Sequence, residues 1–414
     1  MAEGLESMQV RGLKSAVEPR TRHSAAAYGL VATAAFCLLV VGSNIPGPLL
    51  PVYRDRLELS TFTVTALFAV YLVGLVVTFT VVARTGLPAH ATRVLPAAVV
   101  VCLAGDLALL AGSEAVAWLF VGRILVGVSV GLGTGSTATI VLATRGERGR
   151  AIAATGTLLG SFLGLVASAA VADLLPAPTT TIYCIHATWL AVTAVALVAA
   201  HRRSRGTVTR LILAPDETGP SRLTHPATGR STPRLRMAGI ALGAAGWAIG
   251  GIVVGLLPTV VTDMTGSGSI TVTSLAPIVL IGVACIAPRV IGSLPSPVAA
   301  GAIAVGAGLC FVGVWAENLS TIFVACVMWG VGQGFAYANG LRIVAAGVPP
   351  IEQGRVASQY ASIAYGFTGV VAVTTGWIAT AAGTVSGVGF AGVVFAALSA
   401  AAVALGFRRW PQAR

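Results

Sequence analysis

The chain has 414 residues, of which 56% are hydrophobic and only 10% are charged, and its mean hydropathy is +0.88. A water-soluble domain carries about 25% charged residues, so this composition excludes a soluble globular protein and predicts a chain that lies in a lipid bilayer. The formal net charge of +12 would also fit a nucleic-acid-binding protein, a class that the distribution of the basic residues excludes below.

The chain begins with a polar stretch, residues 1–25, which lacks the apolar core of a signal peptide and which we interpret as a cytoplasmic tail. Twelve apolar runs follow, each long enough for a helix to cross a bilayer, which takes about 20 residues. Runs of this length predict helices, because only helices and closed barrels satisfy their backbone hydrogen bonds in lipid. The expected spans are Ala26–Pro48, Thr61–Ala83, Val94–Gly112, Val116–Leu142, Ala151–Leu174, Thr180–Ala200, Ala238–Thr259, Ile270–Gly292, Pro297–Ala316, Thr321–Ala345, Val356–Ala381 and Val385–Phe407.

A polar, arginine-rich segment divides these spans into six and six, and we interpret it as a flexible cytoplasmic linker, with anionic-lipid binding as an alternative. The two groups of spans share short matches in the same order, such as LLPVY with LLPTV and TVTALFAVYLVG with TVTSLAPIVLIG. The sequence therefore predicts an all-α membrane protein of twelve transmembrane helices in two pseudo-symmetric bundles. The expected units are the tail 1–25, the bundle 26–200, the linker 201–237, the bundle 238–407 and the tail 408–414.

The basic residues set the expected orientation. With both termini in the cytoplasm, only Arg54 and Arg56 of the 26 Lys and Arg residues fall outside, and Arg123 lies within a span. This bias is the positive-inside pattern of a membrane protein. The positive charge is therefore a feature of topology, and we expect no nucleic-acid partner.

Arg123 lies well inside the fourth span, where an arginine costs about 3 kcal/mol or more on insertion scales. Arg123, Gly127, Gly131 and Gly135 recur every four residues. This spacing places them on one helix face, where a neighbouring helix or a substrate can come close to the backbone.

An arginine followed by glycines four and eight residues later, here Arg123, Gly127 and Gly131, is typical of the fourth helix of one transporter family. Together with the two similar halves and the NIPGPLLPVY exit of the first span, it resembles the major facilitator superfamily over nearly the whole chain. More closely, the chain resembles the twelve-helix drug:proton antiporter branch. The resemblance implies the major facilitator fold, with alternating access around a central cavity lined by spans 1, 4, 7 and 10.

The sequence departs from this branch in two places. The loop after the second span reads ARTGLPAHATR and lacks the aspartate of the family pattern. In the fifth span Gly160 and Gly164 persist, but Leu165 stands in place of the proline of the antiporter motif, and Ser168 and Ala169 in place of its glycine pair. The departure in the fifth span favours uptake as an alternative to export.

Asp106 in the third span and Arg123 in the fourth lie deep in the membrane, each roughly 10 Å from the outer end at about 1.5 Å per residue. We expect them to form an ion pair, which either cancels the insertion cost or takes part in proton coupling as Arg123 exchanges partners. His186 in the sixth span is the third proton-coupling candidate, with a packed neutral side chain as the alternative.

Polar and aromatic residues on the expected cavity helices are the substrate-binding candidates, with ordinary helix packing as the alternative. They are Asn44, Tyr71, Trp247, Trp329, Gln333, Tyr337 and Tyr365. Aromatic walls with few fixed polar groups suit amphiphilic or aromatic ligands. Trp329, Gln333 and Tyr337 are four residues apart and are expected to share one face.

Two matching loops carry the conformational-switch candidates. Glu147 and Arg150 are echoed by Glu352 and Arg355 at the corresponding cytoplasmic ends of the second half. We expect inter-helix salt bridges that hold the outward-open state, with solvated loop charges as the alternative. The six cysteines lie in apolar runs without a CxxC motif, so we expect neither disulfides nor a metal site.

These patterns predict a secondary carrier in a bacterial inner membrane, a monomer that exports small amphiphilic or aromatic compounds in exchange for protons. Uptake of a small organic solute by proton symport or uniport is one alternative, and a membrane sensor without transport activity is another. No metal cluster, phosphate-binding loop or convergent acid–base set is visible in the sequence, so we expect neither an enzyme nor a cofactor.

Overall fold

The computed structural model describes residues 24–85, 87–145, 147–204, 206–213, 232–348 and 350–406, and every regular element in these ranges is helical. It contains twelve helices long and apolar enough to cross a membrane, at the places that the sequence predicts. The first span, Ser24–Leu57, is broken at Ile45 into a helix over residues 24–44 and the helix α2. The remaining elements of the first half are α2 (Pro46–Leu57), α3 (Thr61–Arg84), η1 (Leu87–His90), α4 (Ala91–Ala111), α5 (Val116–Arg145), α6 (Glu147–Leu174) and α7 (Pro178–Arg203).

The second half repeats this plan after a short helix, α8 (Thr207–Leu213). Its elements are α9 (Pro233–Gly255), α10 (Leu257–Thr265), α11 (Ile270–Ile291), α12 (Ser296–Trp315), α13 (Leu319–Val344), α14 (Pro350–Ala382) and α15 (Thr384–Gly406). The seventh span breaks between α9 and α10, which corresponds to the break before α2 in the first span. The first break directly precedes Pro46 and the second lies at Leu256, two residues before Pro258; proline has no backbone donor and cannot continue the preceding helix.

Side-chain caps define several helix starts. Ser60, Thr232, Ser269 and Asn318 each accept a hydrogen bond from the backbone N–H three residues later, at the beginnings of α3, α9, α11 and α13. Such caps satisfy donors that the first turn of a helix leaves unpaired. They fix where these spans begin and therefore the depth of the residues they carry.

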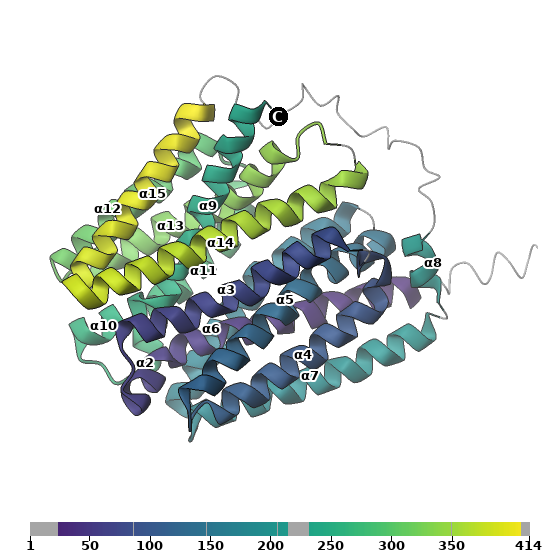
Figure 1. Ribbon diagram of the computed structural model, residues 1–414, viewed down its shortest axis with the longest axis horizontal. Coiled ribbons are helices and arrows are strands. Elements are labelled where there is room, and N and C mark those ends of the chain that lie inside the picture. The colour runs from purple at the N-terminus through teal and green to yellow at the C-terminus, as the bar shows by residue number, and fades with distance from the viewer. Residues whose placement is uncertain are drawn as a thin grey trace, which may run out of the picture.

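Each half is a bundle whose core is built mainly from its own helices, and the two bundles lie side by side (Figure 1). Within the first half α5 packs between α3 and α4, and α4 packs on α7. Within the second half α13 packs on α9, α11 and α12. The halves meet where α3 lies along α14 and where α6 lies along α11.

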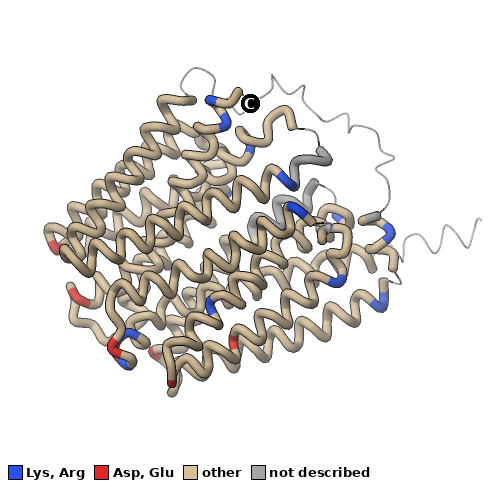
Figure 2. The backbone as a smooth tube through the Cα atoms, in the orientation of Figure 1, with Lys and Arg blue, Asp and Glu red and all other residues tan. Residues whose placement is uncertain are grey.

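Charged residues divide the molecule into two ends, with the described Arg residues mostly at one end and Asp and Glu mostly at the other (Figure 2). We name the second end the acidic end; its acidic residues are Asp55, Glu58, Glu114, Asp173, Asp263 and Glu317. The opposite end, which carries Arg84, Arg145, Arg203 and Arg342 at the ends of α3, α5, α7 and α13, is named the basic end.

The expected linker 201–237 contains an ordered helix, which corrects part of that prediction. α8 contacts α5 and η1, and its Val208 is fully buried against the core of the first half. The hydroxyl of Thr209 lies 3.4 Å from that of Thr92 on α4. One buried valine in a seven-residue helix is too short a pattern to stand out from a polar segment.

Candidate functional site

The glycine stripe of α5 is where α3 approaches most closely. A Cβ built at Gly127 would collide with the carbonyl oxygen of Tyr71, and one at Gly131 would lie 2.7 Å from Cβ of Thr78. On α3 the matching residue is Gly74, where an added Cβ would lie 2.6 Å from the carbonyl oxygen of Ile124. Of the two interpretations that the sequence left open, the structure therefore supports contact with a neighbouring helix.

Arg123 continues the same stripe and lies buried between three helices. Its Nε donates to the carbonyl oxygen of Leu67 on α3 at 3.0 Å, and its Nη1 donates to that of Ser43, in the first helix, at 2.8 Å. The guanidinium carbon lies 4.7 Å from the ring centroid of Tyr71 and 5.9 Å from that of Phe68. Carbonyl dipoles and aromatic faces thus surround the guanidinium. Both attract positive charge and therefore stabilise the buried cation.

Asp106 pairs with His186 and not with Arg123, which corrects the expected ion pair. Oδ2 of Asp106 lies 2.7 Å from Nδ1 of His186, and both side chains are almost fully buried. Helix rotation is the reason: α4 and α5 meet at Gly105 and Gly122, whose backbones nearly touch. Asp106 and Arg123 each follow one of these glycines and are turned by about 100° around their helices, toward α7 and α3 respectively.

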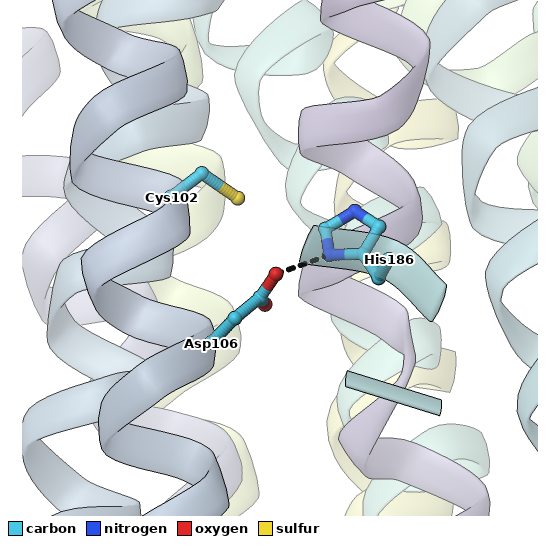
Figure 3. Close-up of side chains that lie close together, drawn as sticks. All are labelled: Cys102, Asp106 and His186. Carbon is cyan, nitrogen blue, oxygen red and sulfur yellow. Dashed lines mark hydrogen bonds and ion pairs between the residues drawn. The ribbon is translucent and has the colours of Figure 1, made fainter. Parts of the chain in front are cut away.

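Cys102 lies one turn before Asp106, and the three side chains of Cys102, Asp106 and His186 offer ligand atoms within 4.8 Å of one another (Figure 3). Figure 3 shows the carboxylate pointing directly at the imidazole of the neighbouring helix. Nε2 of His186 faces the carbonyl oxygen of Leu38 at 2.9 Å. Both ring nitrogens are therefore engaged in hydrogen bonds, and we interpret the group as a hydrogen-bonded pair with a neighbouring thiol.

Aromatic side chains connect the two halves near mid-membrane. The ring centroids of Trp247 on α9 lie 4.9 Å from those of Tyr337 on α13 and 5.0 Å from those of Tyr365 on α14. Tyr365 lies 5.8 Å from Phe79 on α3, which belongs to the other half. Tyr360, which the sequence analysis missed, lies 5.0 Å from Tyr337 and donates its hydroxyl to the Tyr337 carbonyl.

We name these five side chains, Phe79, Trp247, Tyr337, Tyr360 and Tyr365, the interface aromatic group. Tyr71 packs against the same apolar cluster as Trp247 and Tyr365. The aromatic character of Tyr360 was visible in the sequence, but only the packing of α14 on α9 and α3 shows that it faces its neighbours and not lipid.

The remaining polar candidates differ in how they are satisfied. Asn44 donates to the hydroxyl of Ser161 on α6 at 3.1 Å and to the Val40 carbonyl at 2.9 Å, so it ties the first helix to α6. Gln333 is buried one turn before Tyr337, and its Oε1 has no hydrogen-bond partner among the described residues. A buried acceptor without a donor is costly, so Gln333 is an available polar group close to the interface aromatic group.

Trp329 is placed elsewhere, which corrects its interpretation as a cavity residue. Its indole is 2% exposed, donates to the Ile303 carbonyl on α12 at 3.1 Å and packs edge-on against Phe395 of α15. It belongs to the core of the second half. Trp329 is four residues from Gln333 and eight from Tyr337, so at about 100° per residue it is rotated by about 40° and 80° from them and contacts a different neighbour.

The expected switch residues can be described only in part. The side chains of Glu147, Arg150 and Glu352 lie outside the described residues, and Arg355 is exposed near the start of α14. Their proposed salt bridges stay a prediction.

A contact at the acidic end, which the sequence analysis missed, joins the two halves. Asp173, near the end of α6, accepts hydrogen bonds from the Ser269 hydroxyl at 2.7 Å and from the backbone N–H groups of Ile270 and Thr271 at 2.8 and 2.9 Å. The carboxylate thus caps α11 of the other half, at the end of a helix that favours negative charge. We name this contact the Asp173 cap; beside it Arg54 lies 3.7 Å from Asp263 of α10.

Comparisons with known proteins agree with this architecture. The family model described as Major Facilitator Superfamily matches residues 31–373. Among solved structures, the chain is similar to a mutant of the peptide transporter POT in complex with sulfate, with a TM-score of 0.69 and 13% identity over 92% of this chain and 94% of that one. It is similar to a D-xylose-proton symporter with a TM-score of 0.66 and 14% identity over 93% and 98% of the two chains. A sequence search of curated proteins gives no match.

The fold and the family match together define the class: this is a multi-pass membrane transporter. The chain belongs to the Major Facilitator Superfamily. At these identities the similarity to the solved structures shows the fold alone, and the finer assignment to the drug:proton antiporter branch stays a prediction.

Proposed function

We propose that the protein is a proton-coupled secondary carrier of small amphiphilic or aromatic compounds that works by alternating access between its two halves. Asp106 and His186 are the proposed proton-coupling groups. Arg123 has a positioning role, because its donors are engaged by backbone carbonyls of the first helix and α3. Asn44, Tyr71, Trp247, Gln333, Tyr337 and Tyr365 remain the proposed substrate contacts.

The observation that carries this proposal is the interface aromatic group. It lies between the halves, where a carrier binds its substrate, and it presents ring faces, an indole and phenol groups but no charge. Open space lies beside it on α9: a Cβ built at Gly250, three residues after Trp247, meets no atom within 4 Å. Ring faces with few polar groups favour flat, amphiphilic ligands over sugars or polycations.

The orientation of the molecule follows from its charges. We place the basic end and both termini in the cytoplasm of a bacterial inner membrane, as the positive-inside bias favours, and we propose a monomer. In this orientation the Asp173 cap and the Arg54–Asp263 pair close the outer side. The structure then corresponds to a conformation closed toward the outside.

Export in exchange for protons is the first direction we propose, because the Arg123, Gly127 and Gly131 pattern resembles the antiporter branch. Uptake by proton symport is the second. It is favoured by the missing proline of the fifth-helix motif, where Leu165 is fully buried. The likeness to a peptide transporter and a D-xylose-proton symporter fits uptake as much as export.

The test is transport by the purified protein in proteoliposomes under an imposed pH gradient, with a panel of aromatic dyes and antibiotics as substrates. Trp247→Ala should raise the apparent Kd by about two- to ten-fold, which corresponds to the 0.5–1.5 kcal/mol of an aromatic pair. Trp377→Ala is the matched control, because Trp377 lies on α14 and is 61% exposed, away from the aromatic group. Equal effects of the two variants would contradict the proposed substrate site, and transport that ignores the gradient would contradict proton coupling.

A further inference from the structure

The hydrogen bond between His186 and Leu38 fixes the tautomer of the imidazole. Nε2 lies 2.9 Å from the Leu38 carbonyl oxygen. A carbonyl oxygen only accepts, so the hydrogen of this contact belongs to Nε2. When the ring is neutral, Nδ1 is therefore a bare acceptor.

This tautomer determines how many protons the next contact holds. Nδ1 lies 2.7 Å from Oδ2 of Asp106, a hydrogen-bond distance that requires one hydrogen between the two atoms. Either an imidazolium donates to a carboxylate or a carboxylic acid donates to a neutral imidazole. With no proton, a lone pair of Nδ1 would face a lone pair of Oδ2. With two protons, an N–H would face an O–H. Neither state keeps the hydrogen bond.

We infer that Asp106 and His186 form a binding site for one proton, and that this proton holds α4, α7 and the first helix together. The pair is electrically neutral in both arrangements of the proton. Its use as the coupling site rests on the proposed function, but the presence of the site does not. Asp106 is fully buried and His186 is 3% exposed, so the proton is occluded in this conformation.

The surrounding chain is shaped to hold the pair. A Cβ at Gly42 of the first helix would lie 2.5 Å from Cε1 of His186 and 3.3 Å from Sγ of Cys102. A side chain at this position would push the imidazole away from Leu38 and Asp106. The absence of a Cβ at Gly42 therefore makes room for the ring between the first helix and α4.

The other titratable and charged groups around the pair are few. Cys102 is on α4 itself, and Tyr183 is on α7, where its hydroxyl lies 3.4 Å from that of Tyr53 on α2. Arg123 of α5 is within electrostatic range of Tyr183 but is bound to carbonyls of two other helices. Oδ1 of Asp106 has no hydrogen-bond partner among the described residues, so the carboxyl group is satisfied only through His186.

Loss of the proton is therefore coupled to helix movement. Release to water leaves a carboxylate on Asp106 and a neutral imidazole whose lone pair opposes it, and the contact between α4 and α7 opens. Rebinding restores the neutral pair and closes the contact. One proton is taken up and one is given back in each such cycle.

The test is the pH dependence of thermal unfolding of the full-length protein in lipid nanodiscs. In the unfolded chain the imidazole is neutral above about pH 6.5 and the carboxyl is ionised, so the two groups hold no shared proton there. The folded pair holds one, so the folded state binds more protons and stability should fall as pH rises above this value. Asp106→Asn keeps the contact, since its amide N–H donates to Nδ1 of the neutral ring, but has no proton to release.

We expect the Tm of the wild type to fall between about pH 6.5 and pH 8.5 by more than the Tm of Asp106→Asn falls, because other groups titrate equally in both. Glu114→Gln, an exposed change in the turn after α4, is the matched control and should follow the wild type. The double variant Asp106→Asn, His186→Gln, which also lacks the shared proton, should follow Asp106→Asn. Parallel curves for the wild type and all variants would overturn the inference.

Transport measured on the same samples separates this inference from the proposed function. Loss of gradient-driven accumulation in Asp106→Asn with counterflow retained would support both. A Tm difference without any effect of the gradient on transport would support the proton site and refute its coupling role. Gradient-driven transport with parallel Tm curves would place the coupling proton on another group and overturn the inference.

Discussion

Arg123 shows how a single charged residue is held in a membrane without a counter-charge. Two carbonyl oxygens on two helices accept its hydrogen bonds, and two aromatic rings flank its guanidinium. This arrangement needs a planar cation with several donors in fixed directions. A lysine ammonium is a compact point charge and cannot reach both carbonyls while it lies over Tyr71.

Arg123→Lys should therefore lower the stability of the folded protein by about 1.5–3 kcal/mol, the range for a hydrogen bond to a charged group. The measurement is the midpoint of thermal unfolding in detergent. Arg56→Lys, an exposed change in α2, is the control and should leave the midpoint nearly unchanged. Equal midpoints for the two variants would show that the contacts of Arg123 do not stabilise the fold.

At this scale the sequence revealed which residues matter but not which residues they contact. Depth in the membrane follows from position along a span, so Asp106 and Arg123 could be identified as buried charges. Their partners depend on how each helix is rotated, and one residue changes that direction by about 100°. Nothing in the sequence showed that Gly105 and Gly122 would occupy the contact between α4 and α5 and turn the charges away from each other.

At the scale of elements, the Asp173 cap links the end of α6 to the beginning of α11. Three donors of the second half converge on one carboxylate of the first. A negative charge at a helix N-terminus contributes about 0.3–1 kcal/mol when exposed. This contact therefore stabilises the conformation in which the acidic end is closed.

Asp173→Asn removes this charge and should increase the population open at the acidic end, by up to about five-fold for 1 kcal/mol. Spin labels at Leu174 and Thr265, both exposed and on opposite halves, would report the change as a longer distance between the labels. Glu317→Gln at the same end is the control, because no cap depends on it. An unchanged distance distribution would show that the cap does not bias the conformation.

The lengths and order of the spans were predictable, because a bilayer demands about 20 apolar residues in each. Two element-scale features were not. The helix α8 has only seven residues, and its single buried valine gives no visible period. The Asp173 cap joins residues 96 to 98 positions apart, and only the packing of α6 on α11 brings them together.

For the whole molecule, alternating access requires the two halves to separate at the acidic end in part of the cycle. Phe68 of α3 and Gly255 of α9 meet there across the two halves, and a Cβ at Gly255 would lie 3.6 Å from that of Phe68. This spacing falls within the range of about 3.5–4.5 Å for disulfides.

The double variant Phe68→Cys, Gly255→Cys should cross-link on oxidation and lose transport, and a reducing agent should restore it. Each single variant is a control for the loss of the phenylalanine or the gain of a side chain at the glycine. A cross-linked protein that transports at the rate of its reduced form would contradict separation of the halves at this end.

The neutrality of the Asp106–His186 pair has an electrical consequence. With its proton bound the Asp106–His186 pair is neutral, and the net charge of the pair together with Arg123 is +1. After release of the proton, the carboxylate of Asp106 balances the guanidinium of Arg123 and the net charge is zero. Moving one elementary charge through the membrane potential is worth about 2.3 kcal/mol per 100 mV. Voltage should then act on the leg of the cycle in which the pair holds its proton and have no effect on the leg in which it does not.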